Sequence, residues 1–208
     1  SRLLLRNGEQ LLLAIVIPVL ALVGGVLGAR RLGLSFEHAP VDVLTPGVLA
    51  LAVMSTAFTS LAISTGFERR YGLLKRLGAS PLPRSGLLAA KIASLLVVMV
   101  VQALVIGAVA LALGWSPSGG PAGVLVAAAG AVLGTAAFAS LGLTLAGTLR
   151  AEATLAAANL VYLLLMMGGA VVLPRTTYGP AAEVLSLLPS AALGDALRAG
   201  LLCEPAGL

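Results

Sequence analysis

Long apolar runs separated by short polar segments dominate the hydrophobic pattern of this chain. Five such runs stand out, and most of the charged residues lie between them. Each run is near or above the ~20 residues that an α-helix needs to cross the hydrocarbon core of a bilayer. The runs lie at residues 11–27, 47–66, 86–113, 122–149 and 155–173. The pattern therefore predicts an all-α, polytopic membrane helix bundle with five visible spans.

The segments at the two ends of this pattern are amphipathic. Residues 1–10 alternate leucines with Arg2, Arg6 and Glu9, which is typical of a helix that lies at the membrane interface. Residues 174–202 open with two prolines and a glycine and close in a short, rather polar helical pattern. We expect a short extracellular or re-entrant helix in this last segment.

Basic residues are distributed unevenly among the polar segments. If the N-terminus is cytoplasmic, nine of the thirteen basic residues fall on the cytoplasmic side, six of them between positions 67 and 91. Cytoplasmic segments of membrane proteins carry an excess of lysine and arginine, so the pattern predicts a cytoplasmic N-terminus. The nine residues are Arg2, Arg6, Arg69, Arg70, Lys75, Arg76, Arg84, Lys91 and Arg150.

Composition supports a membrane protein over a nucleic-acid-binding one. The chain is 59% hydrophobic and only 10% charged, whereas a soluble domain carries about 25% charged residues. The sequence pI of about 10.1 has a topological explanation, because the cations lie in short links between apolar runs rather than along one soluble face. We therefore expect a lipid bilayer as partner and no nucleic acid.

The sequence offers no equipment for catalysis or metal binding. It has a single cysteine, Cys203, and a single histidine, His38, which lies in a polar segment. The GxxxxGK[ST] pattern of a nucleotide-binding loop does not occur. Ionisable residues are absent from the middle of the apolar runs, where proton-coupled carriers and channels keep them. We expect no catalytic residue and no metal site, and therefore an energy source on another protein.

Two GxxxG patterns mark candidate packing faces. One is Gly24 with Gly28 in the first run, and the other is Gly130 with Gly134 in the fourth. Small residues at this spacing let helix backbones approach closely. The sequence leaves open whether each pattern serves packing within the chain or an interface between subunits.

Three segments together carry a family resemblance. They are LLRNGEQLLLAIVIPVLALV near the start, FERRYGLLKRLGASPLPRSGLLAAK between the second and third runs, and NLVYLLLMMGGAVVLP with LLPSAALGDALRAGL near the end. They resemble the membrane subunit of an ABC-2 type (type V) ABC exporter of the daunorubicin-resistance-like branch. That family has six spans, so the resemblance implies a sixth span beyond those visible here.

The resemblance implies partners and a coupling mechanism. In the family two permeases pair, as identical copies or paralogues, and cytoplasmic ABC ATPase subunits dock beneath them and bind ATP and Mg. This chain itself would hold no cofactor. The segment 67–85 would contain the coupling helix that receives the ATPase movement, and Arg2, Arg6 and Glu9 would provide a second contact from the connecting helix. The expected coupling residues are Glu68, Arg69, Arg70, Leu73, Leu74, Lys75 and Arg76.

These charged residues also have a simpler interpretation. Cations beside a span fix its topology and contact anionic lipid without any protein partner. For Arg2, Arg6 and Glu9, anchoring of the helix at the interface is the corresponding alternative.

The family places the substrate path between the permeases, along spans two and five. Span two is rich in small hydroxyls, and Thr56, Ser60 and Ser64 would share one face of an α-helix. Apolar surface with a few hydroxyls suits an apolar or amphipathic ligand. The alternative for each residue is ordinary helix packing or hydrogen bonding within the bundle. The expected path residues are Met54, Thr56, Phe58, Ser60, Asn159, Tyr162 and Met166.

Taken together, the sequence predicts the permease of a multidrug-efflux type exporter in the bacterial cell membrane. Its substrate would be a drug, antibiotic or lipid-like molecule. Export of a polysaccharide or cell-envelope precursor is one alternative, although aromatics are only 4% of the chain. An ATP-independent carrier and a non-transporting scaffold are two others.

Overall fold

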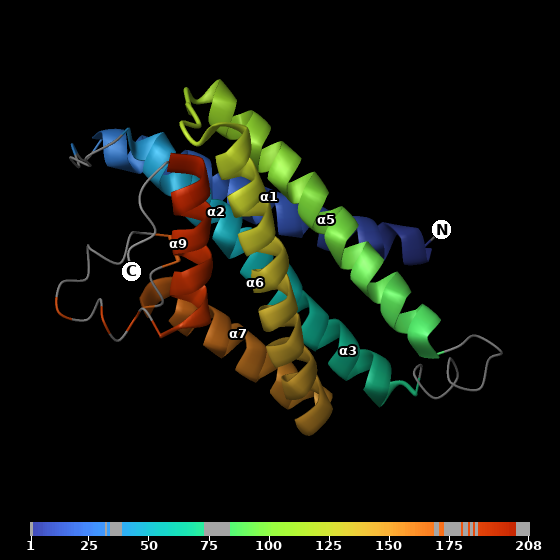
Figure 1. The fold of residues 1–208 in the computed structure, drawn as a ribbon. Helices are drawn as coiled ribbons and strands as arrows, with labels where there is room; N and C mark the ends of the chain where they lie inside the picture. The colour runs from blue at the N-terminus through green and yellow to red at the C-terminus, as the bar shows by residue number, and fades with distance from the viewer. Residues whose placement is uncertain are drawn as a thin grey trace.

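Helices make up all the regular structure in the described part of the chain (Figure 1). The computed structural model describes residues 2–31, 33, 39–72, 84–168, 171–172, 180, 183, 185 and 187–202, with the side chains of residues 2–13 and 84–90 left out. The elements are α1 (Arg2–Arg31), α2 (Pro40–Met54), the π-helix η1 (Ser55–Ser60), α3 (Leu61–Arg70), α5 (Arg84–Ala112), α6 (Gly120–Thr148), α7 (Ala151–Gly168) and α9 (Pro189–Leu202).

Within the described residues, five helices are long and apolar enough to cross a membrane, which confirms the expected fold class. They are Ala14–Arg31, Pro40–Arg70, Lys91–Ala112, Gly120–Thr148 and Ala151–Gly168. The second is the central one. In its apolar stretch 67% of the residues are buried inside the protein, whereas the share is 17–22% in the other four spans. The large exposed aliphatic side chains of the peripheral spans, such as Leu125 (72% exposed) and Leu133 (71%), suit contact with lipid.

The helices extend beyond several of the apolar runs. Residues 1–10 and 11–27 were expected as separate segments, but α1 is continuous through both. The second span begins at Pro40, where a proline suits the first helical turn, rather than at residue 47. It ends at Arg70, so the first residues of the expected loop 67–85 are helical. An apolar run corresponds to the part of a helix that lies in the hydrocarbon core, whereas the helix itself continues into the polar interface.

The fifth span and the helix after it also differ in extent from the sequence pattern. α7 runs from Ala151 to Gly168, and residues 171–172 of the expected span 155–173 form a bend. α9 covers the end of the expected segment 174–202 and lies alongside α6 and α2 rather than beyond their ends (Figure 1). This arrangement favours the re-entrant alternative for α9.

Glycines allow α9 to pack closely on α6. A Cβ atom added at Gly123 would lie 2.0 Å from the Gly200 carbonyl oxygen, and one at Gly134 would lie 2.6 Å from the Leu193 side chain. The pattern of Gly130 with Gly134 therefore serves packing within the chain. Arg198 of α9 is 2% exposed, pairs with Asp195 at 3.3 Å as its spacing suggests, and donates to the Val171 carbonyl at 2.6 Å.

Candidate functional site

The end of α3 is a junction where three consecutive charged residues reach three other helices. Glu68 faces α5, where Lys91 Nζ donates to its Oε2 at 2.6 Å and to Thr65 Oγ1 at 2.8 Å. Both members of this ion pair are about 30% exposed (28% and 29%), so the pair is partly shielded from solvent. The Lys91 contact joins α5, seven residues after its first residue Arg84, to α3. We call the contacts of Glu68, Arg69 and Arg70 the α3 junction.

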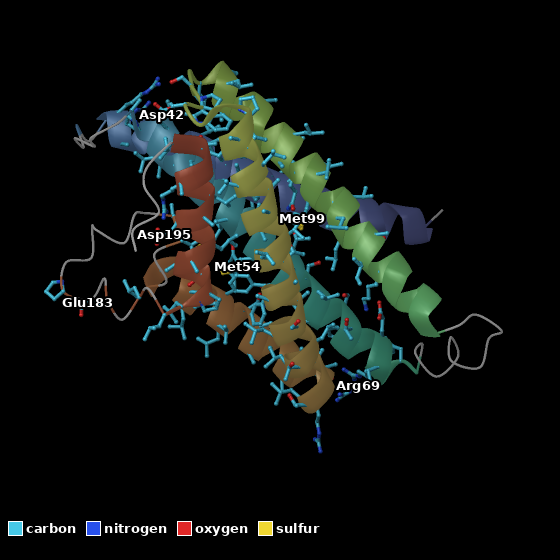
Figure 2. The ribbon with its side chains drawn as sticks, viewed as in Figure 1. Asp42, Met54, Arg69, Met99, Glu183 and Asp195 are labelled. Carbon is cyan, nitrogen blue, oxygen red and sulfur yellow. The ribbon has the colours of Figure 1, made fainter. Side chains whose placement is uncertain are left out.

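Arg69 caps the end of α6. Its guanidinium donates to the carbonyl oxygens of Gly147 and Leu149, the latter at 2.7 Å. Carbonyls in the last turn of a helix lack helical partners and carry the negative end of the helix dipole, so a cation is favoured there. Figure 2 shows Arg69 at the end of the bundle opposite Asp42, with Met54 between them.

Arg70 completes the junction at the start of α7. It forms an ion pair with Glu152, an acidic residue in the first turn of α7, where negative charge is favoured by the helix dipole. The two side chains are 51% and 63% exposed, so the pair contributes at most about 1 kcal/mol. Gly72, at φ 68°, then provides the left-handed residue that ends many helices.

The junction adds contacts within the chain to three of the expected coupling residues. Glu68, Arg69 and Arg70 contact α5, α6 and α7, and their expected contact with an ATPase stays a prediction. Leu73, Leu74, Lys75 and Arg76 lie outside the described residues, as do the side chains of Arg2, Arg6 and Glu9 on α1. The undescribed segment 73–83 thus leaves directly from a helix end that is tied to three others.

A cavity of about 530 Å³ lies on one side of the central span, between that span, α1 and α7. Its wall combines small hydroxyls with aliphatic and aromatic side chains. It opens to the surroundings of the bundle, since the lining residues Ser60 and Ile17 are exposed, Ile17 by 55%. We call it the hydroxyl-lined cavity. Its lining residues are Ala14, Ile17, Pro18, Ser55, Thr59, Ser60, Ile63, Ser64, Phe67, Tyr71 and Tyr162.

The π-helix η1 decides which hydroxyls face this cavity. A π turn closes with an i→i+5 hydrogen bond and therefore takes one residue more than an α turn, which rotates all later side chains. Ser60 and Ser64 line the cavity, but Thr56 points into the protein, where its hydroxyl donates to Gln102. Its place on the cavity wall is taken by Ser55. The predicted common face of Thr56, Ser60 and Ser64 is therefore wrong at Thr56.

Other expected path residues belong to the packed interior or lie away from the cavity. Met54 and Phe58 are 0% and 4% exposed, and the Phe58 ring meets Phe138 edge-on at 6.4 Å between centroids. These two residues have the packing role that was the alternative for each. Met166 is half-buried against the same core, and Asn159 is exposed and does not line the cavity. Only Ser60 and Tyr162 of the seven expected path residues do so.

The sequence interpretation overlooked Gln102, a buried amide in the middle of the third span. Gln102 is 1% exposed, accepts from Thr56 Oγ1 at 2.9 Å and donates to the Ala14 carbonyl at 2.8 Å. That carbonyl is free because Pro18, four residues later, has no N–H to donate to it. Gln102 thus joins the proline site of α1 to the π-helix. The sequence signal that could have identified it is a single amide within a long aliphatic run.

The comparisons with known proteins give one match. A family model described as ABC-2 type transporter matches residues 1–202. The comparison with curated proteins and the comparison with solved structures found no match.

Proposed function

Since the chain belongs to the ABC-2 type transporter family, we propose that it is a permease subunit that carries an apolar or amphipathic molecule along the hydroxyl-lined cavity. A separate ATPase drives this movement. The observation that carries the proposal is the cavity itself, about 530 Å³ in volume and placed beside the central span. A site of this size is in the range of small-molecule pockets, which are mostly apolar with a few placed polar groups.

The composition of the cavity wall supports an amphipathic substrate. Ile17 and Ile63 provide aliphatic surface, while Ser60 presents a hydroxyl. Thr59 Oγ1 is buried and has no hydrogen-bond partner among the described residues, so it is available to a ligand. A drug, antibiotic or lipid-like molecule with few polar groups fits this wall, and multidrug efflux would be the resulting phenotype.

One observation favours a second candidate, export of a sugar-bearing envelope precursor. Three of the eight aromatic residues of the chain line the cavity: Phe67, Tyr71 and Tyr162. Phe67 and Tyr71 stack at 6.1 Å between centroids. Rigid aromatic faces with hydroxyl handles provide the kind of surface that a sugar ring requires.

A second permease copy, identical or a paralogue, would close the cavity. The wall is open on the side of Ile17, and a Cβ atom added at Gly24 or Gly28 of the same helix would meet nothing within 4 Å. The pattern of Gly24 with Gly28 is thus unused by the described part of the chain, in contrast to that of Gly130 with Gly134. Such a pattern suits close packing with a helix from another subunit.

The α3 junction supports a cytoplasmic coupling role in a bacterial cell membrane. The end of the bundle that carries Glu68, Arg69 and Arg70 is the basic end, which the positive-inside rule places in the cytoplasm together with the N-terminus. In the proposed mechanism the segment 73–83 receives the ATPase, with Leu73, Leu74, Lys75 and Arg76 in contact. The junction passes the displacement to α5, α6 and α7.

A pair of cysteine variants tests the path. Ser60 and Ser140 lie at similar depth, ten residues from the end of α3 and eight from the end of α6, but only Ser60 lines the cavity. After Cys203→Ser, we expect Ser60→Cys in membrane vesicles to react with a water-soluble maleimide on the order of tenfold faster than Ser140→Cys. The thiolate that reacts forms readily only where water enters. Equal and slow reaction of both cysteines would exclude an aqueous path here.

A further inference from the structure

The helices α5 and α6 are consecutive in the chain but pack on different neighbours. α5 ends and α6 begins at a common turn, residues 113–119, and the two helices diverge with distance from that turn (Figure 1). α5 packs against α1 and α2, whereas α6 packs most extensively against α9. A gap between two spans is filled either by side chains or by something from the surrounding membrane.

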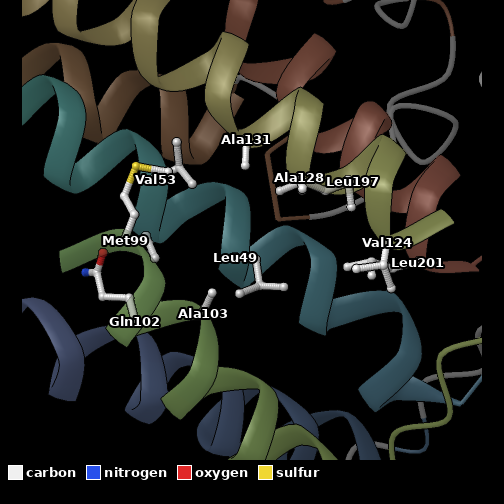
Figure 3. Close-up of a pocket in the computed structure, with 12 residues that line it drawn as sticks. Leu49, Val53, Met99, Gln102, Ala103, Val124, Ala128, Ala131, Leu197 and Leu201 are labelled. Atoms are coloured by element: carbon white, nitrogen blue, oxygen red, sulfur yellow. The ribbon is translucent and has the colours of Figure 1, made fainter. Parts of the chain in front are cut away.

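Side chains leave a cavity of about 210 Å³ in this gap (Figure 3). The floor is formed by α2, one wall by α5, and the other wall by α6 and α9. We call it the α5–α6 cavity, and it is distinct from the hydroxyl-lined cavity. Its lining residues are Leu49, Ala52, Val53, Met99, Gln102, Ala103, Val124, Ala127, Ala128, Ala131, Leu197 and Leu201.

The chemistry of the lining selects an apolar occupant. Among the described lining residues Gln102 is the one polar residue, and both ends of its amide are already hydrogen-bonded, to Thr56 and to the Ala14 carbonyl. None of these described residues is charged. An apolar cavity of about 150 Å³ stays free of water and binds benzene, so a site of 210 Å³ has room for a hydrocarbon segment.

The rims of the cavity continue into the lipid-facing surface. Val124, at one edge, is 53% exposed, and Leu104, next to the lining residue Ala103, is 68% exposed. The lining of α6 runs from Val124 to Ala131, four to eleven residues and thus about 6 to 17 Å from Gly120 at the start of the helix. This depth matches one leaflet of a hydrocarbon core of ~30 Å.

We propose that the α5–α6 cavity binds one acyl chain of a membrane lipid, from the leaflet beside the turn 113–119. The chain enters between α5 and α6 and packs against Leu197 and Leu201 of α9. An empty cavity would leave the lining side chains without partner atoms on one side, and a flexible hydrocarbon chain restores those dispersion contacts. Because Gln102 lines the cavity, the lipid lies against the residue that joins α1 to the π-helix.

Photolabelling of the purified protein in vesicles tests this site. The probe is a phosphatidylcholine that carries a diazirine within one acyl chain, and labelled residues are mapped by mass spectrometry after digestion. Leu197 and Leu201 are only 3% and 7% exposed, so lipid reaches them only through the cavity. We expect labels on these two residues at a level comparable to that on the exposed Leu133 (71%). Labelling of Leu133 without labelling of Leu197 and Leu201 would overturn the proposal.

Two adjacent alanines of α6 provide a matched pair of variants. Both are exposed, but Ala128 lines the cavity and Ala129 does not. Ala128→Phe should fill the cavity and reduce the labels on Leu197 and Leu201 severalfold, whereas Ala129→Phe should leave them unchanged. An equal effect of both variants would contradict the assignment of the site. The labelling pattern of the unmodified protein decides the question by itself if Ala128→Phe does not fold.

Discussion

Replacement of Gly123 by valine is expected to separate α9 from α6 and to destabilise the folded protein by about 3 kcal/mol or more. The added Cβ atom would lie 2.0 Å from the Gly200 carbonyl oxygen, a backbone atom that no rotamer change can move. Intrinsic propensity works in the opposite direction, because valine is a better helix former than glycine. The expected loss of stability therefore comes from the clash alone. Thermal unfolding in detergent, followed by size-exclusion chromatography, measures it.

Gly107→Val is the control for this substitution. Gly107 also lies inside a membrane helix, α5, but a Cβ atom there meets nothing within 4 Å. The same change should leave the unfolding temperature equal or slightly raised. If Gly123→Val were as stable as Gly107→Val, the close packing of α9 on α6 would be wrong.

Replacement of Arg69 by glutamine is expected to uncouple the permease from its ATPase without unfolding it. A cation at an exposed helix end contributes about 1 kcal/mol or less, so the fold survives the change. The link between α3 and the end of α6 is lost, because the guanidinium that bonds Gly147 and Leu149 is gone. In the unmodified complex we expect ATP to change the rate at which maleimide labels Ser60→Cys. With Arg69→Gln, ATP hydrolysis should continue while that response disappears.

Arg150→Gln separates this effect from a simple loss of positive charge. Arg150 lies at the same end of the bundle, and its side chain makes no hydrogen bond or ion pair with the described residues. The ATP response of Ser60→Cys should persist in this variant. Loss of the response in both variants would show that charge at this end, rather than the Arg69 cap, determines coupling.

Much of the fold could be predicted because each membrane span is visible in the sequence as a long apolar run. A helix in lipid must satisfy its backbone internally and present apolar side chains, so the five apolar runs correspond to five helices. The ends of the helices are harder to predict from the sequence, and α3, for example, continues to Arg70 rather than ending with the apolar run at residue 66. Charged side chains beside a span continue the helix when they find partners, and those partners, such as Lys91 and Glu152, are distant in sequence.

The path residues were predicted less well, for reasons that can be named. Hydroxyl spacing was interpreted with an α-helical period, and the six residues of η1 break that period. The hydroxyl spacing of residues 55–60 does not distinguish a π-helix from an α-helix, so the α-helical period places Thr56 on the wrong face. Met54 and Phe58 were grouped with the path by residue type, although burial depends on which helices surround the central span. Tyr162 and Ser60 line the cavity, and their roles in transport stay a prediction.

Co-purification from the native host in mild detergent tests most directly whether this chain is the membrane part of an ATP-driven transporter. The unmodified protein is compared with Lys75→Glu/Arg76→Glu, a charge reversal in the expected docking segment that spares the α3 junction. Mass spectrometry should identify an ABC ATPase with the unmodified protein and little or none with the reversal, while both permeases elute as folded species. Absence of any ATPase from a folded, unmodified permease would contradict the account and favour an ATP-independent carrier or a scaffold.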